Sequence, residues 1–328
     1  MLGPTLEPAR MPTMYFVGVT TGRSIIMKVF PLWAEALGLG RCELKGIDMP
    51  QHDAPERYRE VIRFIRDDPQ ALGALVTTHK IDLLRAGRDL FDELDESARL
   101  MGEVSAIYKH GTRLAGAAKD ALTAGRALEA FLPAGHFQRT GADAFIIGAG
   151  GSSIALSSYL AARERGGDRP ARMFVSNRSP GRLAEIRRIH AAQKLGIPVE
   201  YVHTPEAPLN DAVVARLRAG SLVANATGLG KDAPGSPLTD AAVFPMDGCA
   251  WDFNYRGDLG FLAQARRQEA QRRLRIEDGW LYFVHGWLAV IEEVFHCGIP
   301  KSGPRFQELC RIAEGQRKRG DDTTGMTT

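Results

Sequence analysis

The sequence predicts an α/β protein with two domains, in which parallel sheets are covered by helices on both faces. Three observations predict this class. The chain has 328 residues, enough for two hydrophobic cores of ordinary size. Its composition, 44% hydrophobic and 25% charged, is that of a globular protein. Short apolar runs alternate with longer amphipathic segments, and this alternation starts again near residue 143.

The first series of elements extends to about residue 120. Apolar runs predict strands at residues 15–20, 43–47, 73–77 and 104–108. Amphipathic patterns predict helices at residues 27–39 and 55–66. A further helix is expected to begin at Asp120, because apolar residues recur from there at helical spacing.

The second series begins with a buried strand at residues 143–147, which runs directly into a glycine-rich turn and a helix through residue 160. Further strands are predicted at 172–176, 199–203, 221–225 and 249–253, with a helix at 180–194. The long apolar segment 280–297 predicts a buried helix. From residue 315 onward the chain is polar and rich in Gly and Thr, so we expect a disordered tail.

Charge, hydropathy and cysteine content argue against several classes of function. The net charge is only +3 and no basic run is interleaved with aromatic residues, which argues against nucleic-acid binding. No segment approaches the roughly 20 apolar residues of a membrane span, and the N-terminus has no secretion signal. The four cysteines show neither C-x-x-C spacing nor a histidine at zinc-ligand spacing. We therefore expect a cytoplasmic protein with reduced thiols, no membrane partner and no metal site.

The strongest local signal is the glycine-rich turn after the strand at 143–147. Residues 148–153 read GAGGSS, and a helical pattern follows. Such a turn lets backbone N–H groups meet a pyrophosphate at the helix N-terminus. Gly148 permits the tight turn, Gly150 lets phosphates approach the backbone, and Ser153 takes the place of the usual third glycine. The predicted dinucleotide site comprises Gly148, Gly150, Gly151 and Ser152.

The end of the next strand favours NADP over NAD. An NAD site usually places Asp or Glu there to hold the ribose 2′-hydroxyl. This chain has Asn177-Arg178-Ser179 instead, with no acid in the turn. Arg178 can pair with a 2′-phosphate, with Ser179 and Arg182 as helpers. The alternative is a helix N-cap flanked by solvated arginines.

Four motifs, in order, resemble those of the shikimate dehydrogenase family over nearly the whole chain. The glycine-rich turn resembles that family's G-A-G-G-x-x-x-A, and Asn177-Arg178-Ser179 resembles its N-R-[ST] clamp for NADP. Residues 225–230 (NATGLG) resemble its N-x-T-P-x-G loop, with Gly228 where proline is usual. Residues 252–255 (DFNY) match its D-x-x-Y strand end. The resemblance implies cofactor contacts from Thr227 and Gly279, and a substrate contact from Tyr255.

The resemblance also implies an architecture and an activity. An N-terminal α/β substrate domain (residues 1–120) would precede a Rossmann-like NADP-binding domain (121–278), with residues 279–328 returning to the first domain. The implied activity is hydride transfer between NADP(H) and a ring hydroxyl or ketone, as in aromatic amino acid biosynthesis. The substrate would be a small cyclic alcohol, and the protein a monomer or homodimer.

The catalytic residues implied by the resemblance are Lys80 and Asp120. The family's V-T-x-P-x-K element resembles residues 76–80 (VTTHK), shortened by one residue and without proline. Its G-x-N-T-D element resembles residues 116–120 (GAAKD), which retain only the glycine and the aspartate. Oxidation of a secondary alcohol needs a group that accepts the hydroxyl proton. A lysine can do so where burial or positive neighbours lower its pKa, and the aspartate would orient it.

Several substrate ligands of the family pattern are changed. Its S-x-S loop retains Ser24 but has Ile26 for the second serine, and Leu75 replaces an asparagine. Ser105 stands where the A-V-N-T asparagine is expected, while Thr77 is kept. Arg23 either replaces the missing carboxylate anchor or is a solvated loop residue. The expected substrate residues are therefore Ser24, Thr77, Ser105, Tyr255 and Arg23, in a pocket less polar than shikimate requires.

The C-terminal G-x-x-M-L-x-x-Q helix of the family pattern places its glutamine at Gly286, if Gly279 is the anchor. His285, next to Gly286, and His79 are both expected near the predicted pocket, but a lone histidine is more often structural. Shikimate is the reference substrate, and a related cyclic hydroxy acid or polyol is the main variation. The alternatives are an NAD-dependent quinate/shikimate enzyme, a methylenetetrahydrofolate dehydrogenase-like protein and a non-catalytic NADP-binding regulator.

Overall fold

The computed structural model describes residues 6–231 and 233–324, with side chains up to residue 318. The chain divides into two compact units. The first comprises Met1–Lys119 and Val284–Thr328, and the second comprises Asp120–Phe283. Helix α12 (Trp280–Phe295) begins in the second unit and ends in the first, and it matches the buried helix predicted for this apolar segment.

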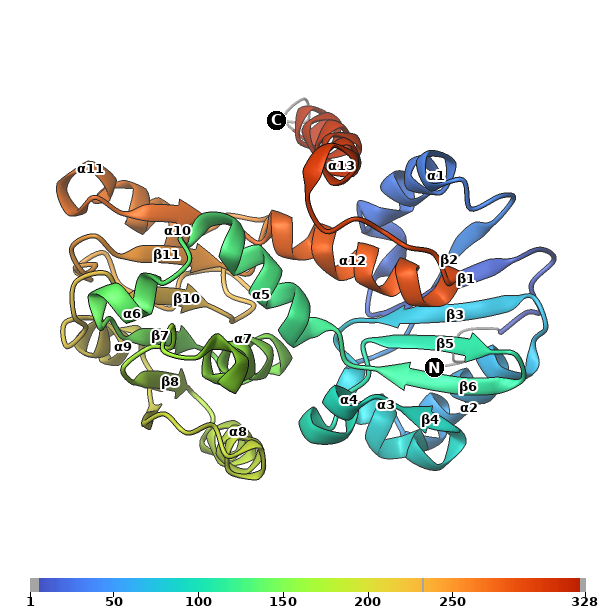
Figure 1. Ribbon diagram of the computed structural model, residues 1–328, viewed down its shortest axis with the longest axis horizontal. Helices are drawn as coiled ribbons and strands as arrows, with labels where there is room; N and C mark the ends of the chain where they lie inside the picture. Colours follow the sequence, from blue (N-terminus) through green and yellow to red (C-terminus); the bar gives the residue numbers. More distant parts are fainter. Residues whose placement is uncertain (1–5, 232, 325–328) are drawn as a thin grey trace. The chain divides into compact units, whose positions relative to one another are not determined.

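The first unit contains a six-stranded sheet in the order β2-β1-β3-β5-β6-β4 (Figure 1). Its strands are β1 (Thr13–Gly18), β2 (Glu43–Asp48), β3 (Ala71–Val76), β4 (Glu93–Leu94), β5 (Ala106–His110) and β6 (Arg113–Ala117). Its helices are α1 (Ile26–Leu37), α2 (Pro55–Asp67), α3 (Lys80–Gly87), α4 (Glu96–Met101) and α13 (Gly303–Thr324), with short 3₁₀ turns η1 (Thr21–Arg23) and η2 (Arg88–Leu90).

The expectation of purely parallel sheets is wrong for this unit. Strand β1 is parallel to β2 and β3, but β5 is antiparallel to both β3 and β6. Only residues 111–112 separate β5 from β6, and so short a turn can join only antiparallel neighbours. The carboxyl ends of β1, β3 and β6 consequently share one edge of the sheet with the amino end of β5.

The second unit contains a six-stranded sheet, entirely parallel, in the order β12-β11-β10-β7-β8-β9 (Figure 1). Its strands are β7 (Ala144–Ile147), β8 (Met173–Asn177), β9 (Val199–His203), β10 (Leu222–Asn225), β11 (Cys249–Asp252) and β12 (Arg275–Glu277). Its helices are α5 (Asp120–Phe131), α6 (His136–Thr140), α7 (Gly151–Ala161), α8 (Pro180–Gln193), α9 (Ala207–Val214), α10 (Gly260–Arg266) and α11 (Glu269–Arg272), with the 3₁₀ turn η3 (Arg163–Arg165).

Counted within this unit from β9, the strands run 3-2-1-4-5-6, which is the Rossmann order. The order reverses between β7 and β10, and folds of this kind bind ligands beside the loops that follow the two strands at such a point. Alternate residues of β7 pack into two separate cores: Ala144 and Ile146 face one, Phe145 and Ile147 the other. Both faces of the sheet are thus buried, and the predicted α/β class is confirmed.

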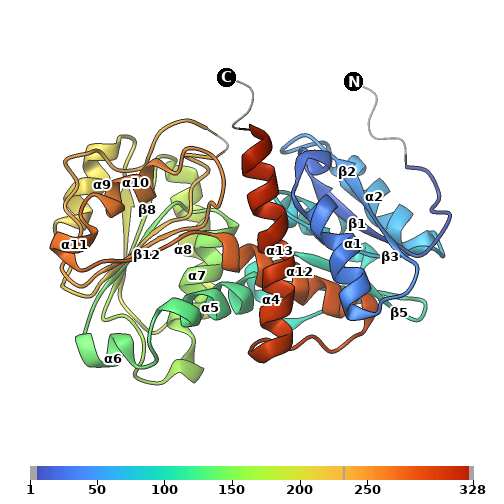
Figure 2. The same cartoon turned by 90° about the horizontal axis from the view of Figure 1, so that it is seen from above.

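The predicted disorder of the tail from residue 315 is wrong as far as Thr324, because α13 continues to that residue; residues 325–328 lie outside the described part of the chain. Helix α13 runs alongside α1 (Figure 2). The Trp33 indole N–H donates to the carbonyl of Leu309 at 2.9 Å. Leu309 and Ala313 are fully buried, so tertiary burial supports a helix whose composition is polar.

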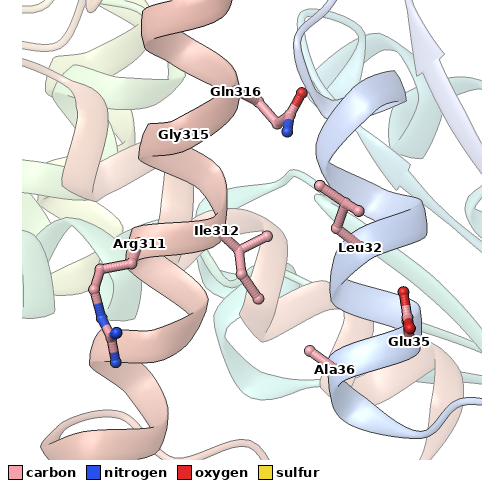
Figure 3. Close-up of a pocket in the computed structure, with 7 residues that line it drawn as sticks. All are labelled: Leu32, Glu35, Ala36, Arg311, Ile312, Gly315 and Gln316. Carbon is pink, nitrogen blue, oxygen red and sulfur yellow. The ribbon is translucent and has the colours of Figure 1, made fainter.

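A shallow groove of about 420 Å³ lies between α1 and α13 (Figure 3). Leu32 and Ala36 of α1 face Ile312 of α13, whereas Arg311 points away from α1. The described residues that line this groove include none of the predicted site residues. Within the described ranges, no helix combines the length and the apolar character needed to cross a membrane.

Candidate functional site

The glycine-rich turn of the second unit has the geometry of an anion cradle. Gly148 has a φ of +119°, and a Cβ atom there would lie 2.7 Å from the carbonyl oxygen of Ala226. Glycine is therefore required at this position by both conformation and space. Gly150 precedes the first turn of α7, and a Cβ built on it meets no heavy atom within 4 Å. The helix N-terminus thus opens onto free space beside Gly150, next to Gly151 and Ser152 of the first turn.

Ser153 adds a second feature that fits a bound dinucleotide. Its Oγ is fully buried and has no hydrogen-bond partner among the described residues. A buried hydroxyl usually has a partner, and a ligand or an ordered water can supply it. A Cβ on Gly148 would lie 3.2 Å from this Oγ, so the hydroxyl lies directly beneath the turn. The residues present therefore fit a pyrophosphate at the start of α7.

Replacing Gly150 with alanine is expected to weaken NADPH binding by about tenfold or more, or roughly 1.4 kcal/mol, because the new methyl group fills the space of the phosphates. The φ of −93° at this residue suits alanine, so the unfolding midpoint should hardly change. Titration calorimetry and thermal unfolding measure the two effects. Gly148→Ala is the contrasting variant and should lose stability. Unchanged NADPH affinity in Gly150→Ala would contradict the phosphate assignment.

The turn between β8 and α8 presents Arg178. The Asn177 side chain accepts a hydrogen bond from the Ser179 backbone N–H at 2.8 Å, and Ser179 is the N-cap of α8. Arg182 pairs with Glu185 on the same helix at 2.8 Å. Arg178 is exposed, and its carbonyl accepts a hydrogen bond from the ring of His203. Asn177 and Ser179 therefore shape the turn, while the Arg178 guanidinium faces solvent.

A closed polar network holds the loops after β10 and β11. The Asn225 amide donates to Asp252 at 3.1 Å, and its oxygen accepts from both the backbone N–H and the hydroxyl of Thr227. The Asn254 backbone N–H donates to Asp252, and its side chain donates to the Thr227 carbonyl. Burial raises the pKa of Asp252 to about 6, against the opposing effect of these hydrogen bonds. Thr227 thus holds the shape of the loop after β10.

Gly279 allows α12 to begin against the loop after β11. A Cβ on Gly279 would lie 2.0 Å from the carbonyl oxygen of Phe253, so any larger residue would collide with backbone. Gly279 therefore has a packing role, whatever it contributes to cofactor binding.

Tyr255 is half-buried, with its ring packed against Trp280 and Phe283 at centroid distances of 5.4 and 4.9 Å.

Asp120 is the first residue of α5 and is only 6% exposed. The Tyr282 hydroxyl donates to its Oδ2 at 3.1 Å. Tyr282 was not predicted as a site residue. A sequence signal for it exists, because Tyr282 stands at the methionine place of the G-x-x-M-L-x-x-Q pattern. A hydroxyl there adds a donor that methionine lacks.

In the first unit, Thr77 and Lys80 follow β3 at the shared sheet edge. The Thr77 hydroxyl donates to the Val17 carbonyl at 3.2 Å, which ties the loop to β1. Lys80 is the first residue of α3, and its backbone N–H donates to the Thr77 carbonyl. The Val104 N–H in turn donates to the Lys80 carbonyl at 3.3 Å. The backbone of Lys80 is therefore fixed from two neighbouring segments.

Ser105 lies at the same edge of the sheet, and its hydroxyl is hydrogen-bonded within the protein. Its Oγ accepts a hydrogen bond from the Lys119 backbone N–H at 2.8 Å, and the residue is only 3% exposed. The Lys119 ammonium pairs with Glu293 of α12 at 2.6 Å. This arrangement was not predicted, because the sequence places Glu293 far along the chain. The Ser105 hydroxyl is thus already engaged in holding the residue before Asp120.

The loop after β1 carries Arg23 and Ser24. Ser24 follows η1 and is half-buried, with its N–H donating to the Thr21 carbonyl at 2.9 Å, whereas Arg23 is exposed. Ile26 is fully buried in the first turn of α1, and Leu75 is buried in β3. Both apolar replacements therefore belong to the core of this unit.

The two histidines near the predicted pocket have structural partners. His79 is buried, its Nδ1 lies 3.1 Å from the Tyr58 hydroxyl, and burial lowers its pKa. His285 stacks on Phe306 with a centroid distance of 4.6 Å. Both are consistent with the structural interpretation. In the described part of the chain, no group of three or more His, Cys, Asp and Glu side chains is arranged to hold a metal ion.

Two curated relatives match the chain. The shikimate dehydrogenase (NADP(+)) of Streptococcus gordonii is 31% identical over 182 residues, which are 55% of this chain and 59% of the relative. The enzyme of the same name from Symbiobacterium thermophilum is 28% identical over 216 residues, 65% of this chain and 68% of the relative. The match therefore spans about three-fifths to two-thirds of these relatives. No protein-family model matches the chain.

Solved structures match nearly the whole chain. Shikimate dehydrogenase from Aquifex aeolicus superposes with a TM-score of 0.71 at 17% identity, covering 94% of this chain and 98% of the other. The Thermus thermophilus enzyme, solved with NADP(H) and shikimate, gives 0.66 at 24% identity, with coverages of 92% and 100%. Quinate dehydrogenase from Corynebacterium glutamicum, solved with NAD, gives 0.68 at 20%, with coverages of 93% and 99%.

This chain has the shikimate dehydrogenase fold. The resemblance to that family, predicted from the motifs, is confirmed by the relatives and by the fold. Within this fold, the chain differs from the family pattern at positions that the structure describes individually. Ile26 and Leu75 are buried apolar residues, the Ser105 hydroxyl is taken up by a backbone amide, and Tyr282 adds a hydroxyl beside Asp120.

Proposed function

We propose that this protein is an NADP-dependent oxidoreductase that transfers hydride between NADP(H) and a ring hydroxyl or ketone. The observation that carries this proposal is the sequence similarity to two curated shikimate dehydrogenases (NADP(+)). The shared fold supports it. In this proposal the first unit binds the ring alcohol and the second unit binds NADP(H). A cytoplasmic location and a monomeric or homodimeric state remain predictions from the sequence.

The described residues fit NADP at two places. A pyrophosphate at the N-terminus of α7 fits the free space beside Gly150. It also fits the buried hydroxyl of Ser153, which has no hydrogen-bond partner among the described residues. The exposed Arg178 suits a 2′-phosphate, with Asn177 and Ser179 holding its turn. When bound, the nicotinamide would supply the hydride acceptor or donor.

Lys80 is the proposed proton acceptor. In the oxidation direction its Nζ takes the proton of the substrate hydroxyl as the hydride leaves the same carbon, and it returns the proton in reduction. Lys80 is the first residue of α3. Asp120 would accept a hydrogen bond from the substrate hydroxyl. It would thereby orient the group that reacts.

The substrate is proposed to be shikimate or a related cyclic hydroxy acid or polyol. Thr77 and Ser24 supply hydroxyl groups, and Tyr255 supplies a phenol. Ile26 and Leu75 cannot replace the polar ligands of the family pattern, because apolar side chains form no hydrogen bonds to a substrate hydroxyl. Arg23, which is exposed, is the residue proposed to bind a carboxylate. These features favour a ring with fewer polar contacts than shikimate makes.

The decisive assay follows NADP reduction by absorbance with purified protein and a panel of shikimate, quinate, an aminoshikimate and several inositols, each repeated with NAD. We expect turnover of at least one ring alcohol with NADP. Turnover of shikimate itself would extend the name of the relatives to this chain. Activity restricted to another ring would point to Ile26, Leu75 and Ser105 as determinants of specificity. If no ring alcohol is turned over while NADPH still binds tightly, the proposed enzymatic function is refuted and the NADP-binding regulator is favoured.

Replacing Arg178 with serine is expected to lower kcat/KM for NADP by about 10- to 100-fold and to leave the value for NAD nearly unchanged, because a charge-assisted phosphate contact is lost. Arg188→Ser, which removes an exposed arginine from α8, is the control for the general loss of positive charge. An equal loss with both cofactors would mean that Arg178 serves the adenine alone. The NAD-dependent alternative would then be favoured.

A further inference from the structure

Tyr282 and Asp120 are 162 positions apart in the sequence and form a hydrogen bond within the second unit. The Tyr282 hydroxyl donates to Asp120 Oδ2 at 3.1 Å. Asp120 is the first residue of α5. Asp120 is only 6% exposed, so rotation of its side chain is limited by packing as well as by this bond.

The ring of Tyr282 is held by aromatic packing. It meets Phe253 edge-to-face at a centroid distance of 4.9 Å and an interplanar angle of 72°, and it meets Trp251 at 6.4 Å and 89°. Trp251 is itself fixed, since its indole N–H donates to the Asp278 carbonyl at 3.1 Å. A ring held on these aromatic neighbours gives its hydroxyl one direction, and that direction points to Asp120.

We propose that Tyr282 is a positioning residue, whose hydroxyl holds the Asp120 carboxylate in the orientation that meets the substrate hydroxyl. This inference rests on the proposed function, in which Asp120 acts together with Lys80. A carboxylate offers about four lone-pair directions. One of them, on Oδ2, is taken by the Tyr282 hydroxyl, which restricts how the carboxylate can turn. Methionine, the residue of the family pattern at this place, donates no hydrogen bond. The hydrogen bond from this position to Asp120 therefore depends on the tyrosine of this chain.

The test compares Tyr282→Phe with wild type on the best substrate of the panel. Phenylalanine keeps the packing on Phe253 and Trp251 and removes only the hydroxyl. We expect kcat to fall about tenfold or more, because a hydrogen bond to a charged group is lost. The NADPH affinity and the unfolding midpoint should stay near the wild-type values. Tyr282→Met should show the same loss of kcat, since neither side chain donates.

Two further variants separate positioning from a general structural role. Tyr159→Phe is the matched control, because the Tyr159 hydroxyl also donates to a carboxylate, that of Glu129, away from the site. It should leave kcat unchanged. In an Asp120→Asn background, Tyr282→Phe should cause little additional loss, since its effect passes through Asp120.

Each other outcome overturns the inference in a recognisable way. An active wild type with an equally active Tyr282→Phe removes the positioning role and leaves the proposed function intact. A fall in kcat matched by a fall in NADPH affinity or in the unfolding midpoint makes Tyr282 a packing residue. A wild type inactive on every ring alcohol refutes the proposed function and this inference with it.

Discussion

Replacing Lys80 with methionine is expected to lower kcat/KM for the ring alcohol by about 10³-fold, within the usual range for loss of a general acid–base group. Methionine is similar in length but cannot take up a proton. The hydroxyl proton then has no acceptor as the hydride leaves. NADPH affinity should remain within about twofold of wild type, because the proposed cofactor residues all belong to the second unit.

The control is Lys45→Met, which removes a half-buried lysine paired with Glu43 on the edge strand β2 of the same unit. It should retain wild-type kinetics. Initial rates over a range of substrate concentrations and fluorescence titration with NADPH provide the two readouts. Retention of more than about a tenth of the activity in Lys80→Met would exclude Lys80 as the base. A parallel loss of NADPH affinity would instead place its effect on cofactor binding or folding.

The largest expected effect on stability concerns His190, which is buried between α7, α8 and β9. Its Nε2 lies 2.7 Å from the Ser157 hydroxyl and its Nδ1 2.9 Å from the Tyr201 hydroxyl. Ser157 donates to the Ser153 carbonyl, so it accepts from Nε2–H, and Nδ1 accepts from Tyr201. This network suits a neutral ring, and burial lowers the pKa of His190 to about 4.

A histidine whose folded-state pKa lies below its unfolded value of 6.5 contributes stability above pH 6.5. That contribution is lost as pH falls toward 4, since the unfolded chain binds the proton first. The expected loss across this window is roughly 3 kcal/mol. Asp252 acts in the opposite direction. Its pKa is raised from 3.8 to about 6, so its contribution is present below pH 3.8 and lost as pH rises to 6.

Between pH 4 and 6 the two slopes therefore oppose each other in the wild type. His190→Gln should remove the first slope and leave the second, so that stability falls as pH rises through this window. Urea unfolding at half-unit pH steps measures the slope, which is the readout because the absolute stability will also drop. His203→Gln, an exposed histidine of the same unit, is the control. An unaltered slope in His190→Gln would show that His190 is charged in the folded protein.

The sequence by itself determined the elements whose signals are local. A buried strand followed by GAGGSS specifies a tight turn and a helix start, and Gly148 and Gly150 occupy the expected places in the structure. The Asn177-Arg178-Ser179 turn was likewise predictable, because the Asn177 side chain and the Ser179 N-cap act on residues two or three places away. Such interactions are written within a few residues, so a pattern reveals them.

The tertiary structure decided whatever depends on residues far apart in the chain. The strand that became β5 was predicted, but its antiparallel direction and its partner β6 were missed, because an apolar run does not show the direction of its neighbour. The helix of the tail depends on the burial of Leu309 against α1, which a polar composition conceals. The candidate site follows the same rule. The Ser105 hydroxyl accepts from Lys119, and the Tyr282 hydroxyl reaches Asp120, only because folding brings distant segments together. The residue types in the sequence show which chemical groups the protein has. Long-range packing decides which of these groups form hydrogen bonds within the fold.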